Sequence, residues 1–499
     1  MTGLSSAAVD VESAVTLAAP DTARVPTGQD DHAGFLRTMA AMSDRKEAIV
    51  CVADLTARLM LETGRGLQLS EAHLAGLDLS GFDLRRANLN RAQLYGTNLS
   101  DCDLGEASLI CPSLERTKFA RASLRGTYVH AFAAQVCDFR QADLSDIADG
   151  TGALFHGCLF NDATIMGSML SGSSFYQTVF DGARLDGTNL QGCQFVESSA
   201  AGVSWRDTYL DNAVFSRVDL SGGVFTGAKG ADVVVQRPLG AGNVDLSGAS
   251  LPGLRLVGVR GAVLAARGLM ARGADVRDCA LDGSDFSGAD FAESSWTRVC
   301  LTGASFERAA ADNSRWLGCN LDGAVLEGLK AENITMIECS MRDGRLAGIQ
   351  ARCASIRNSV MHRADLTNAY LYRAMITGDP PVSMDLRECR LTNAVLVQAY
   401  VAANLSGADL TYAHLAYSRL SQSNLAGADL GGAQLFQCTA IKSDFTGARL
   451  TGVRPPLLAD RCAGLDEALR DTADPSAAAL AAQVSDLRAV LAKHNRRST

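Results

Sequence analysis

The chain has 499 residues, of which 47% are hydrophobic and 20% charged, with a formal net charge of −9, a composition typical of a soluble protein. No run of about 18 apolar residues occurs, so we expect no membrane span, and residues 1–30 lack the basic cluster and apolar core of a secretory signal. Fourteen cysteines without such a signal predict free thiols in a reducing compartment, hence a cytoplasmic protein.

The first 66 residues show no long-range regularity. Residues 1–30 are rich in Ala, Ser, Thr, Asp and Gly, which predicts a disordered N-terminal segment. Residues 31–66 are expected to form a helical N-terminal cap, because Asp44 and Glu47 make a capping pair ahead of Ile49 and Leu59.

An apolar residue then returns every five residues from Leu69 to Leu450, and we call this residue the centre. The residue two places before each centre is small or apolar, and the residue one place before is often Asp or Asn, as in Asp78 and Asn98. A period of five fits neither an α-helix nor an alternating strand.

Segments such as SGADF (287–291) and SGADLTYAHL (406–415) resemble the pentapeptide-repeat family, whose unit is A-(D/N)-L-x-x. The resemblance implies an all-β fold, a right-handed quadrilateral parallel β-helix, over residues 67–452. Four five-residue sides would make one coil of twenty residues, with the centre and the residue two before it pointing inward. About 19 coils at roughly 4.8 Å would give a rod on the order of 90 Å long.

The five-residue register breaks three times, each time by one residue: between centres 154 and 160, between 230 and 246, and between 401 and 405. A slip of one residue requires a local bulge. The weakest centres are Ala134, Asp149, Gly230, Gly261 and Pro381.

The middle break loses the motif altogether. Residues 236–243 are either an outward loop or a degenerate coil, since proline and glycine cluster there. If it is a loop, it is a candidate partner-binding site formed by Gln236, Arg237, Pro238 and Leu239.

At the other end, Pro455 and Pro456 are expected to stop the repeats, and residues 453–499 to form a helical C-terminal cap or dimerisation segment. Apolar residues spaced by four, three and four make a coiled-coil-like seam there: Leu480, Val484, Leu487 and Leu491. This helix either folds back on the last coil or forms a homodimer. The second alternative is favoured by the resemblance to gyrase-protecting members that dimerise through their C-terminal ends.

No pattern indicates catalytic, cofactor-binding or metal-binding residues, so we expect no enzyme and no cofactor. Nine cysteines stand two places before a centre, where Cys is a small apolar filler: Cys102, Cys137, Cys158, Cys193, Cys279, Cys319, Cys339, Cys389 and Cys438. Three tryptophans occupy centres and should be buried, their bulk offset by nearby alanine centres: Trp205, Trp296 and Trp316, with Ala200, Ala311 and Ala331. Trp296 and Trp316 are twenty residues apart, so their rings should lie within about 4.5–7 Å.

The formal charge is −10 in residues 1–245 and +1 in residues 246–499. Mixed charge on the walls favours a protein partner over a nucleic acid, which would select a basic stripe. We therefore expect a non-enzymatic macromolecule-binding scaffold or adaptor; by resemblance it would be an accessory or effector of a bacterial secretion system. The alternative, also from the resemblance, is a DNA-mimicking protein that binds and protects a type II topoisomerase (DNA gyrase).

Overall fold

The computed structural model describes residues 66–379, 384–453 and 457–470. The chain divides into two compact units, residues 1–204 and 205–499, each of which is described by itself. The predicted disordered segment 1–30, the predicted N-terminal cap over 31–66 except for Gly66, and the seam from Leu480 to Leu491 lie outside the described residues.

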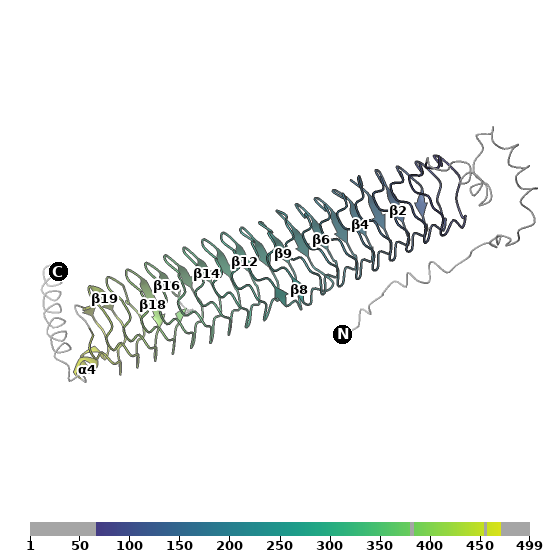
Figure 1. The fold of residues 1–499 in the computed structure, drawn as a ribbon. Helices are drawn as coiled ribbons and strands as arrows, with labels where there is room; N and C mark the ends of the chain where they lie inside the picture. The colour runs from purple at the N-terminus through teal and green to yellow at the C-terminus, as the bar shows by residue number, and fades with distance from the viewer. Residues whose placement is uncertain (1–65, 380–383, 454–456, 471–499) are drawn as a thin grey trace, which may run out of the picture. The chain divides into compact units, whose positions relative to one another are not determined.

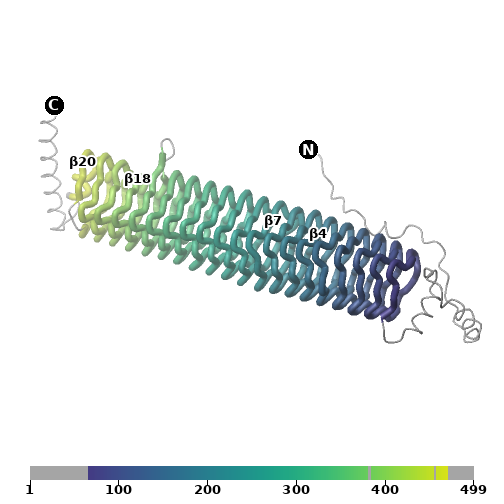
Figure 2. Tube along the Cα trace, turned by 90° about the horizontal axis from the view of Figure 1, so that it is seen from above, coloured from purple at the N-terminus to yellow at the C-terminus, as the bar shows by residue number. Residues whose placement is uncertain are grey.

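Each unit is a quadrilateral parallel β-helix, in which the backbone of one coil pairs with the next (Figures 1 and 2). In the first unit Gln68 is bridged to Asn88, and Asn88 to Ser108, so the partners are 20 residues apart. The Leu69 N–H donates to the Asn88 carbonyl and the Asn88 N–H donates to the Leu67 carbonyl, both at 2.8 Å. The predicted coil of four five-residue sides is confirmed.

One of the four sides forms regular strands, and we call it the sheet face. In the first unit it consists of β1 (Leu114–Glu115), β2 (Ala133–Gln135), β3 (Leu154–His156), β4 (Ser174–Tyr176) and β5 (Gln194–Val196). In the second unit the strands are β6 (Val214–Ser216), β7 (Val234–Gln236), β9 (Arg255–Val257), β11 (Asp275–Arg277), β12 (Ser295–Thr297), β13 (Arg315–Leu317), β14 (Thr335–Ile337), β15 (Ser355–Arg357), β16 (Met375–Thr377) and β18 (Tyr400–Asn404).

Five short strands and one helix complete the second unit. β17 (Met384–Asp385) pairs with β18, β8 (Val244–Asp245) pairs with β10 (Leu264–Ala265), and β19 (Cys438–Ile441) pairs with β20 (Leu457–Asp460), all in parallel. Parallel pairing therefore continues beyond Pro455 and Pro456, which do not end the repeats as predicted. The helix α4 (Leu465–Arg470) follows, and it buries Leu465, Ala468 and Leu469.

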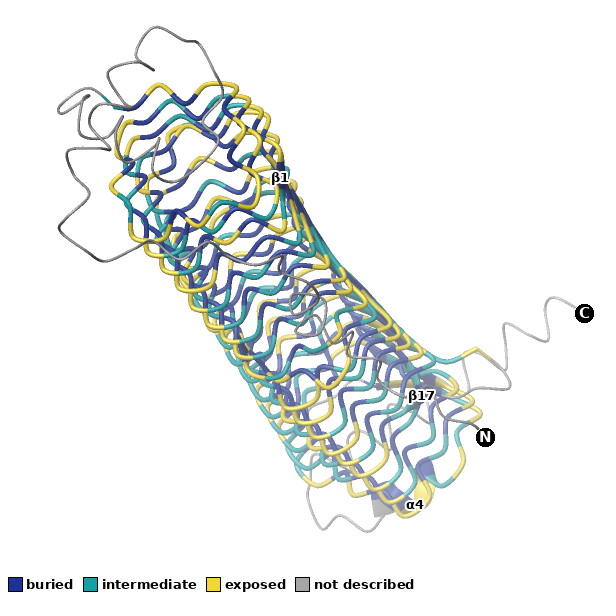
Figure 3. Ribbon diagram, turned by 90° about the vertical axis from the view of Figure 1, so that its right-hand side faces the viewer, coloured by how far each residue is buried: buried dark blue, intermediate teal, exposed yellow. Residues whose placement is uncertain are grey.

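Buried residues recur between more exposed ones along the coils (Figure 3). In the first unit the inward phenylalanines of successive coils stack: the Phe119 and Phe139 centroids are 4.9 Å apart at 3°, and Phe139 and Phe160 are 4.8 Å apart at 2°. This separation matches the distance between neighbouring strands. Identical coils therefore place like side chains in contact, which is why aromatic residues recur at intervals of about twenty.

The tryptophans follow the same rule in the second unit. Trp205, Trp296 and Trp316 are all fully buried, as are the alanine centres predicted to accompany them. Trp296 and Trp316 pair in register, and their ring centroids are 5.7 Å apart. Both predictions are confirmed, which fixes the twenty-residue coil at this point.

The first slip was predicted at the wrong residue. Leu154 is not an inward centre but is 43% exposed, and Phe155 points inward against Phe175, with centroids 5.0 Å apart. The extra residue lies earlier, at Ala148 and Asp149. The Ala148 N–H donates to the Thr127 carbonyl and the Asp149 carbonyl accepts from Val129, so both oppose Tyr128 in a β-bulge.

The second slip is also a bulge. The Leu239 N–H donates to the Val218 carbonyl at 3.0 Å, and the Leu220 N–H donates to the Gly240 carbonyl at 2.8 Å, so two residues oppose Asp219. Of the two alternatives for 236–243, the degenerate coil is the one formed. The third slip is confirmed, because Val401, Ala403 and Leu405 are all buried within four residues of one another.

One irregularity escaped prediction. Val360 is bridged to Asp385, and Tyr370 to Val395, so this coil contains 25 residues rather than 20. The prediction of an unbroken run of five-residue sides is wrong here by one side. The next inward centre of the coil after Ile376 is Leu386, ten residues later rather than five. An insertion of five residues keeps the phase of the repeat, which is why the sequence pattern concealed it.

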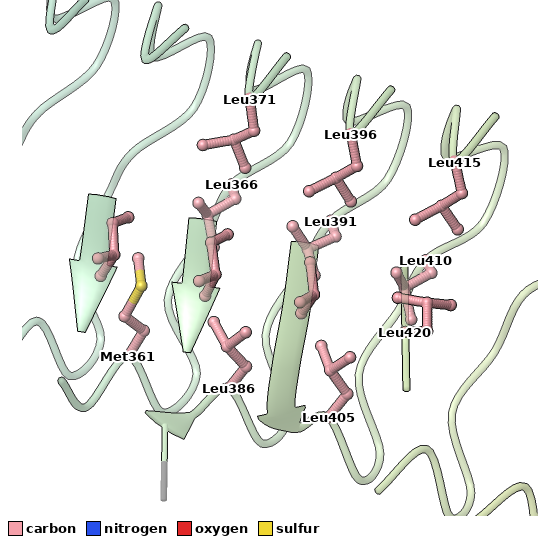
Figure 4. A pocket seen from close by; sticks show the side chains of 13 residues that line it. Met361, Leu366, Leu371, Leu386, Leu391, Leu396, Leu405, Leu410, Leu415 and Leu420 are labelled. Carbon is pink, nitrogen blue, oxygen red and sulfur yellow. The ribbon is translucent and has the colours of Figure 1, made fainter. Parts of the chain in front are cut away.

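Two small apolar cavities lie beside the irregular coils of the second unit. One of about 10 Å³ is lined by the side chains around the 25-residue coil (Figure 4). The other, of about 40 Å³, lies at the second bulge, where Val235 and Ala241 follow Phe215 and Leu220 at equivalent inward positions.

Filling the larger cavity should stabilise the second unit. A cavity costs about 24 cal/mol per Å³, so Val235→Leu is expected to stabilise its coil by up to about 1 kcal/mol. Val276→Leu is the matched control, because Val276 is buried on the same face and does not line this cavity, and overpacking should cost about 1–3 kcal/mol. Hydrogen exchange of peptides covering 233–257 and 274–297 measures both. Equal effects of the two substitutions would contradict the assignment of the cavity.

Candidate functional site

The side chain of the residue before the centre makes different hydrogen bonds on different sides of the coil. On the three sides outside the sheet face, an Asp or Asn there accepts a hydrogen bond from the N–H two residues later. Asp78 accepts from Ser80 at 3.1 Å, Asp143 accepts from Ser145 at 2.9 Å, and Asp409 accepts from Thr411 at 2.9 Å. The carboxylate thereby satisfies a backbone donor at the corner that the neighbouring coil does not reach.

The sheet face does not use this device. Among the described residues of the sheet face, the side chain of the residue directly before the centre never accepts a hydrogen bond from the N–H two residues later. The residues on either side of the centre already pair there with neighbouring coils. Asp and Asn are accordingly almost absent from this position, which holds Ser174, Gln194, Val214, Val234, Arg255, Asp275, Ser295, Arg315, Thr335 and Ser355. Folding therefore leaves the outward residues of the sheet face free to vary.

Arginines at the corners bind carboxylates of the adjacent coil. Arg121 contacts Asp101 at 2.6 Å, and Arg363 contacts Asp343 at 2.7 Å, each pair spanning twenty residues. These hydrogen bonds hold the pKa of both carboxyl groups below their ordinary values. Many charges predicted to lie on the walls are thus paired within the protein.

The nine cysteines predicted to point inward are all buried and reduced. Burial raises the pKa of Cys193, Cys389 and Cys438 to about 12 each. At neutral pH these thiols are protonated and unreactive. Among the described residues no group of three His, Cys, Asp or Glu side chains is arranged to hold a metal ion.

The proposed partner-binding residues lie on the wall of the second bulge. Gln236 ends β7 in register with Ser216 and Val257, and the Arg237 N–H donates to the Val257 carbonyl at 2.7 Å. The Leu239 side chain is 63% exposed. The bulge presents Arg237 and Leu239 outward without a protruding loop, and their role in binding a partner stays a prediction.

No helix of the described residues is long and apolar enough to cross a membrane. What these residues form is a pair of β-solenoid units built from five-residue sides, with closed apolar interiors and flat outer walls.

The model of the pentapeptide-repeat family matches the chain in eight copies, within residues 68–105, 87–126, 158–195, 188–227, 272–308, 403–439 and 419–454. The chain belongs to the pentapeptide-repeat proteins. A search of curated proteins gives no match to it.

The solved structures that match parts of the chain are distant in sequence. QnrB1, a plasmid-mediated fluoroquinolone resistance protein, is 21% identical over 42% of this chain and 92% of its own, with a TM-score of 0.22. HetL, involved in heterocyst differentiation regulation in the cyanobacterium Nostoc, is 18% identical over 56% of this chain and 91% of its own, with a TM-score of 0.23. Rfr23 from the cyanobacterium Cyanothece is 20% identical over 30% and 90%, with a TM-score of 0.10. These similarities concern the fold alone.

Removing a corner carboxylate should destabilise the fold, whereas truncation at the equivalent sheet-face position should not. Asp409 accepts bonds from the Thr411 N–H and hydroxyl and, at 2.8 Å, from the Thr392 hydroxyl. We expect Asp409→Ala to cost about 1–2 kcal/mol and Ser355→Ala to change stability by less than about 0.5 kcal/mol. Thermal unfolding at pH 7 measures both, with Asp409→Asn, which keeps an acceptor, as the control.

The Asp409 effect should also depend on pH. Burial raises the pKa of Asp409, but its hydrogen bonds with Thr411 and Thr392 outweigh burial and leave the pKa below its ordinary value of 3.8. A depressed native pKa means that the contribution is present above pH 3.8 and is lost as the pH falls through the native value. The gap between wild type and Asp409→Ala should therefore narrow below pH 3.8. A gap that widens in acid would contradict this assignment.

Thiol labelling tests the inward register. Iodoacetamide at pH 8 should modify the exposed Cys111 in the native protein and leave Cys193, Cys389 and Cys438 unmodified until the protein unfolds. Peptide mass spectrometry identifies each site. Rapid native modification of the three buried thiols would show that the register is wrong.

Proposed function

We propose that this pentapeptide-repeat scaffold is a non-catalytic adaptor that binds a protein partner through its outer walls. The interior of the described residues supports this proposal because it is filled mainly by apolar side chains, and the two cavities beside the irregular coils, of about 10 and 40 Å³, are far below the roughly 300 Å³ of a small-molecule site. The observation that carries it is the sheet face, where the fold places rows of outward side chains without needing any particular residue.

Cross-linking from each wall tests the adaptor role. A photo-reactive residue would replace Ser295 on the sheet face, or Asn320, Ser305 or Lys330 on the other three sides. In cells of origin, we expect one wall to yield a single stoichiometric protein adduct that is lost when charges on that wall are reversed. Turnover of a small molecule by the purified protein, or adducts shared equally by all four walls, would refute the proposal.

DNA mimicry directed at DNA gyrase is the second candidate, and one feature of the first unit favours it. Residues 141–183 contain five aspartates and no lysine or arginine. Two of these carboxylates lie against a basic side chain, since Asp146 contacts Arg125 at 2.9 Å and Asp149 contacts His130 at 3.3 Å. Partial neutralisation weakens the resemblance to the regularly spaced charges of a DNA backbone, so we rank this candidate below the adaptor. No feature of the sequence or of the described residues supports a role as an accessory or effector of a secretion system.

A supercoiling assay separates the two candidates. Purified protein at up to tenfold molar excess over gyrase is expected to change neither supercoiling nor its inhibition by a fluoroquinolone. If activity is instead restored, substituting Asp162 and Asp181 by Asn should abolish the rescue. That result would replace the adaptor proposal with mimicry.

A further inference from the structure

The sheet face of the second unit differs in charge from the wall opposite. From β6 to β15, the strand residues and the corner residue after each strand include seven arginines, no lysine and three acids. The arginines are Arg217, Arg237, Arg255, Arg277, Arg298, Arg315 and Arg357, and the acids are Asp275, Asp278 and Glu338. The equivalent residues two sides further along the same coils include five acids and three arginines.

Two of these arginines are engaged within the fold. Arg277 contacts Asp275 and Arg298 contacts Asp278, both at 2.7 Å. Four others are exposed and form no ion pair with any described residue: Arg237, Arg255, Arg315 and Arg357. A guanidinium without an internal partner remains available to a carboxylate on another molecule.

Aliphatic side chains stand between the unpaired arginines. Leu317 and Ile337 are half-buried neighbours in register on β13 and β14. Arg315 lies on the same strand as Leu317, and Arg357 on β15 is in register with Ile337. Three adjacent strands thus carry an aliphatic pair, with Arg315 on the strand of Leu317 and Arg357 on the strand beyond Ile337, and the three strands lie within about 10 Å along the coils.

The composition of this patch identifies the class of partner. Protein interfaces are enriched in arginine and depleted in lysine, and they combine an apolar centre with a polar rim. A nucleic-acid surface requires a dense basic stripe, whereas here the unpaired guanidinium groups are sparse and the neighbouring faces carry acids.

We propose that the sheet face from β7 to β15, centred on Arg315, Leu317, Ile337 and Arg357, docks a protein whose surface presents aliphatic side chains flanked by Asp or Glu. This inference rests on the adaptor proposal and names the wall and the chemistry of the partner. Carboxylates pair with the two guanidinium groups, and aliphatic groups cover Leu317 and Ile337. The fold tolerates arginine and aliphatic residues on this face because the residue directly before each centre does not have to be Asp or Asn.

Two fluorescein-labelled peptides test the proposal by anisotropy with the full-length protein: a 20-residue polyglutamate, and the same peptide with four glutamates replaced by leucine. We expect both to bind, the leucine-containing peptide more tightly. Arg315→Glu with Arg357→Glu should weaken both by at least tenfold. Leu317→Ser should remove only the advantage of the leucine peptide, a readout that loss of charge alone would not produce.

The matched control reverses two lysines of the preceding wall, Lys229→Glu with Lys330→Glu, at the same change in net charge. These residues are exposed on the same unit, and binding should change less than twofold. If the double variant Arg315→Glu with Arg357→Glu unfolds, Arg315→Gln with Arg357→Gln replaces it. This neutral double variant should weaken binding of the peptides by at least threefold.

Three outcomes would overturn the proposal. A 20-base-pair DNA duplex that binds more tightly than either peptide, and loses binding with the arginine variant, would make the face a nucleic-acid site. Self-association in sedimentation that the same variant abolishes would make the occupant a second copy. Equal losses with the arginine and lysine variants would show non-specific charge attraction. If wall cross-linking also locates the partner on another side, only this inference fails and the adaptor proposal stands.

Discussion

The constraint on which the structure depends is the hydrogen bonding of each coil to the next. Because N–H and carbonyl groups pair across twenty residues, each side chain contacts its own equivalents one coil away. Inward positions therefore sort by size into stacks, as in Phe119, Phe139 and Phe160. Outward side chains form rows along the coils, and the residue type at each position of a row can differ. At the corners, arginines and carboxylates of adjacent coils pair along these rows.

Those hydrogen bonds do not serve the four sides equally. On the other three sides an Asp or Asn, where the sequence has one, accepts the corner N–H, as at Asp78, Asn88 and Asp143, whereas no side chain of the sheet face does so among the described residues. The Asp or Asn of the pentapeptide motif therefore contributes to folding on those three sides. On the sheet face the residue before the centre has the freedom to vary without loss of such a hydrogen bond. The Arg315–Arg357 patch lies where this freedom exists.

The sequence alone predicted most of the centres, the inward cysteines and the contact between Trp296 and Trp316, because each follows from a period of five and a coil of twenty. The prediction failed where two adjacent residues were both apolar and either could be the centre. Leu154 and Phe155 are such a pair, and only the stacking against Phe175 identifies Phe155 as the centre. The 25-residue coil was hidden because inserting five residues preserves the phase. The sheet face was not predicted, although Asp and Asn are almost absent there from the residue before the centre.

Irregular coils show what the fold can absorb. A bulge adds one residue at a corner and leaves the stack above it intact, as the pairing of Val234 with Arg255 across the second bulge shows. The cost is a local mismatch of side-chain size, visible as the cavity beside Val235. Since that bulge lies next to Arg237 and Arg255, a coil that contains a cavity adjoins the arginine-rich part of the sheet face. Poor packing lowers local stability, so we expect this coil to open more readily than the coils that bury Trp296 and Trp316.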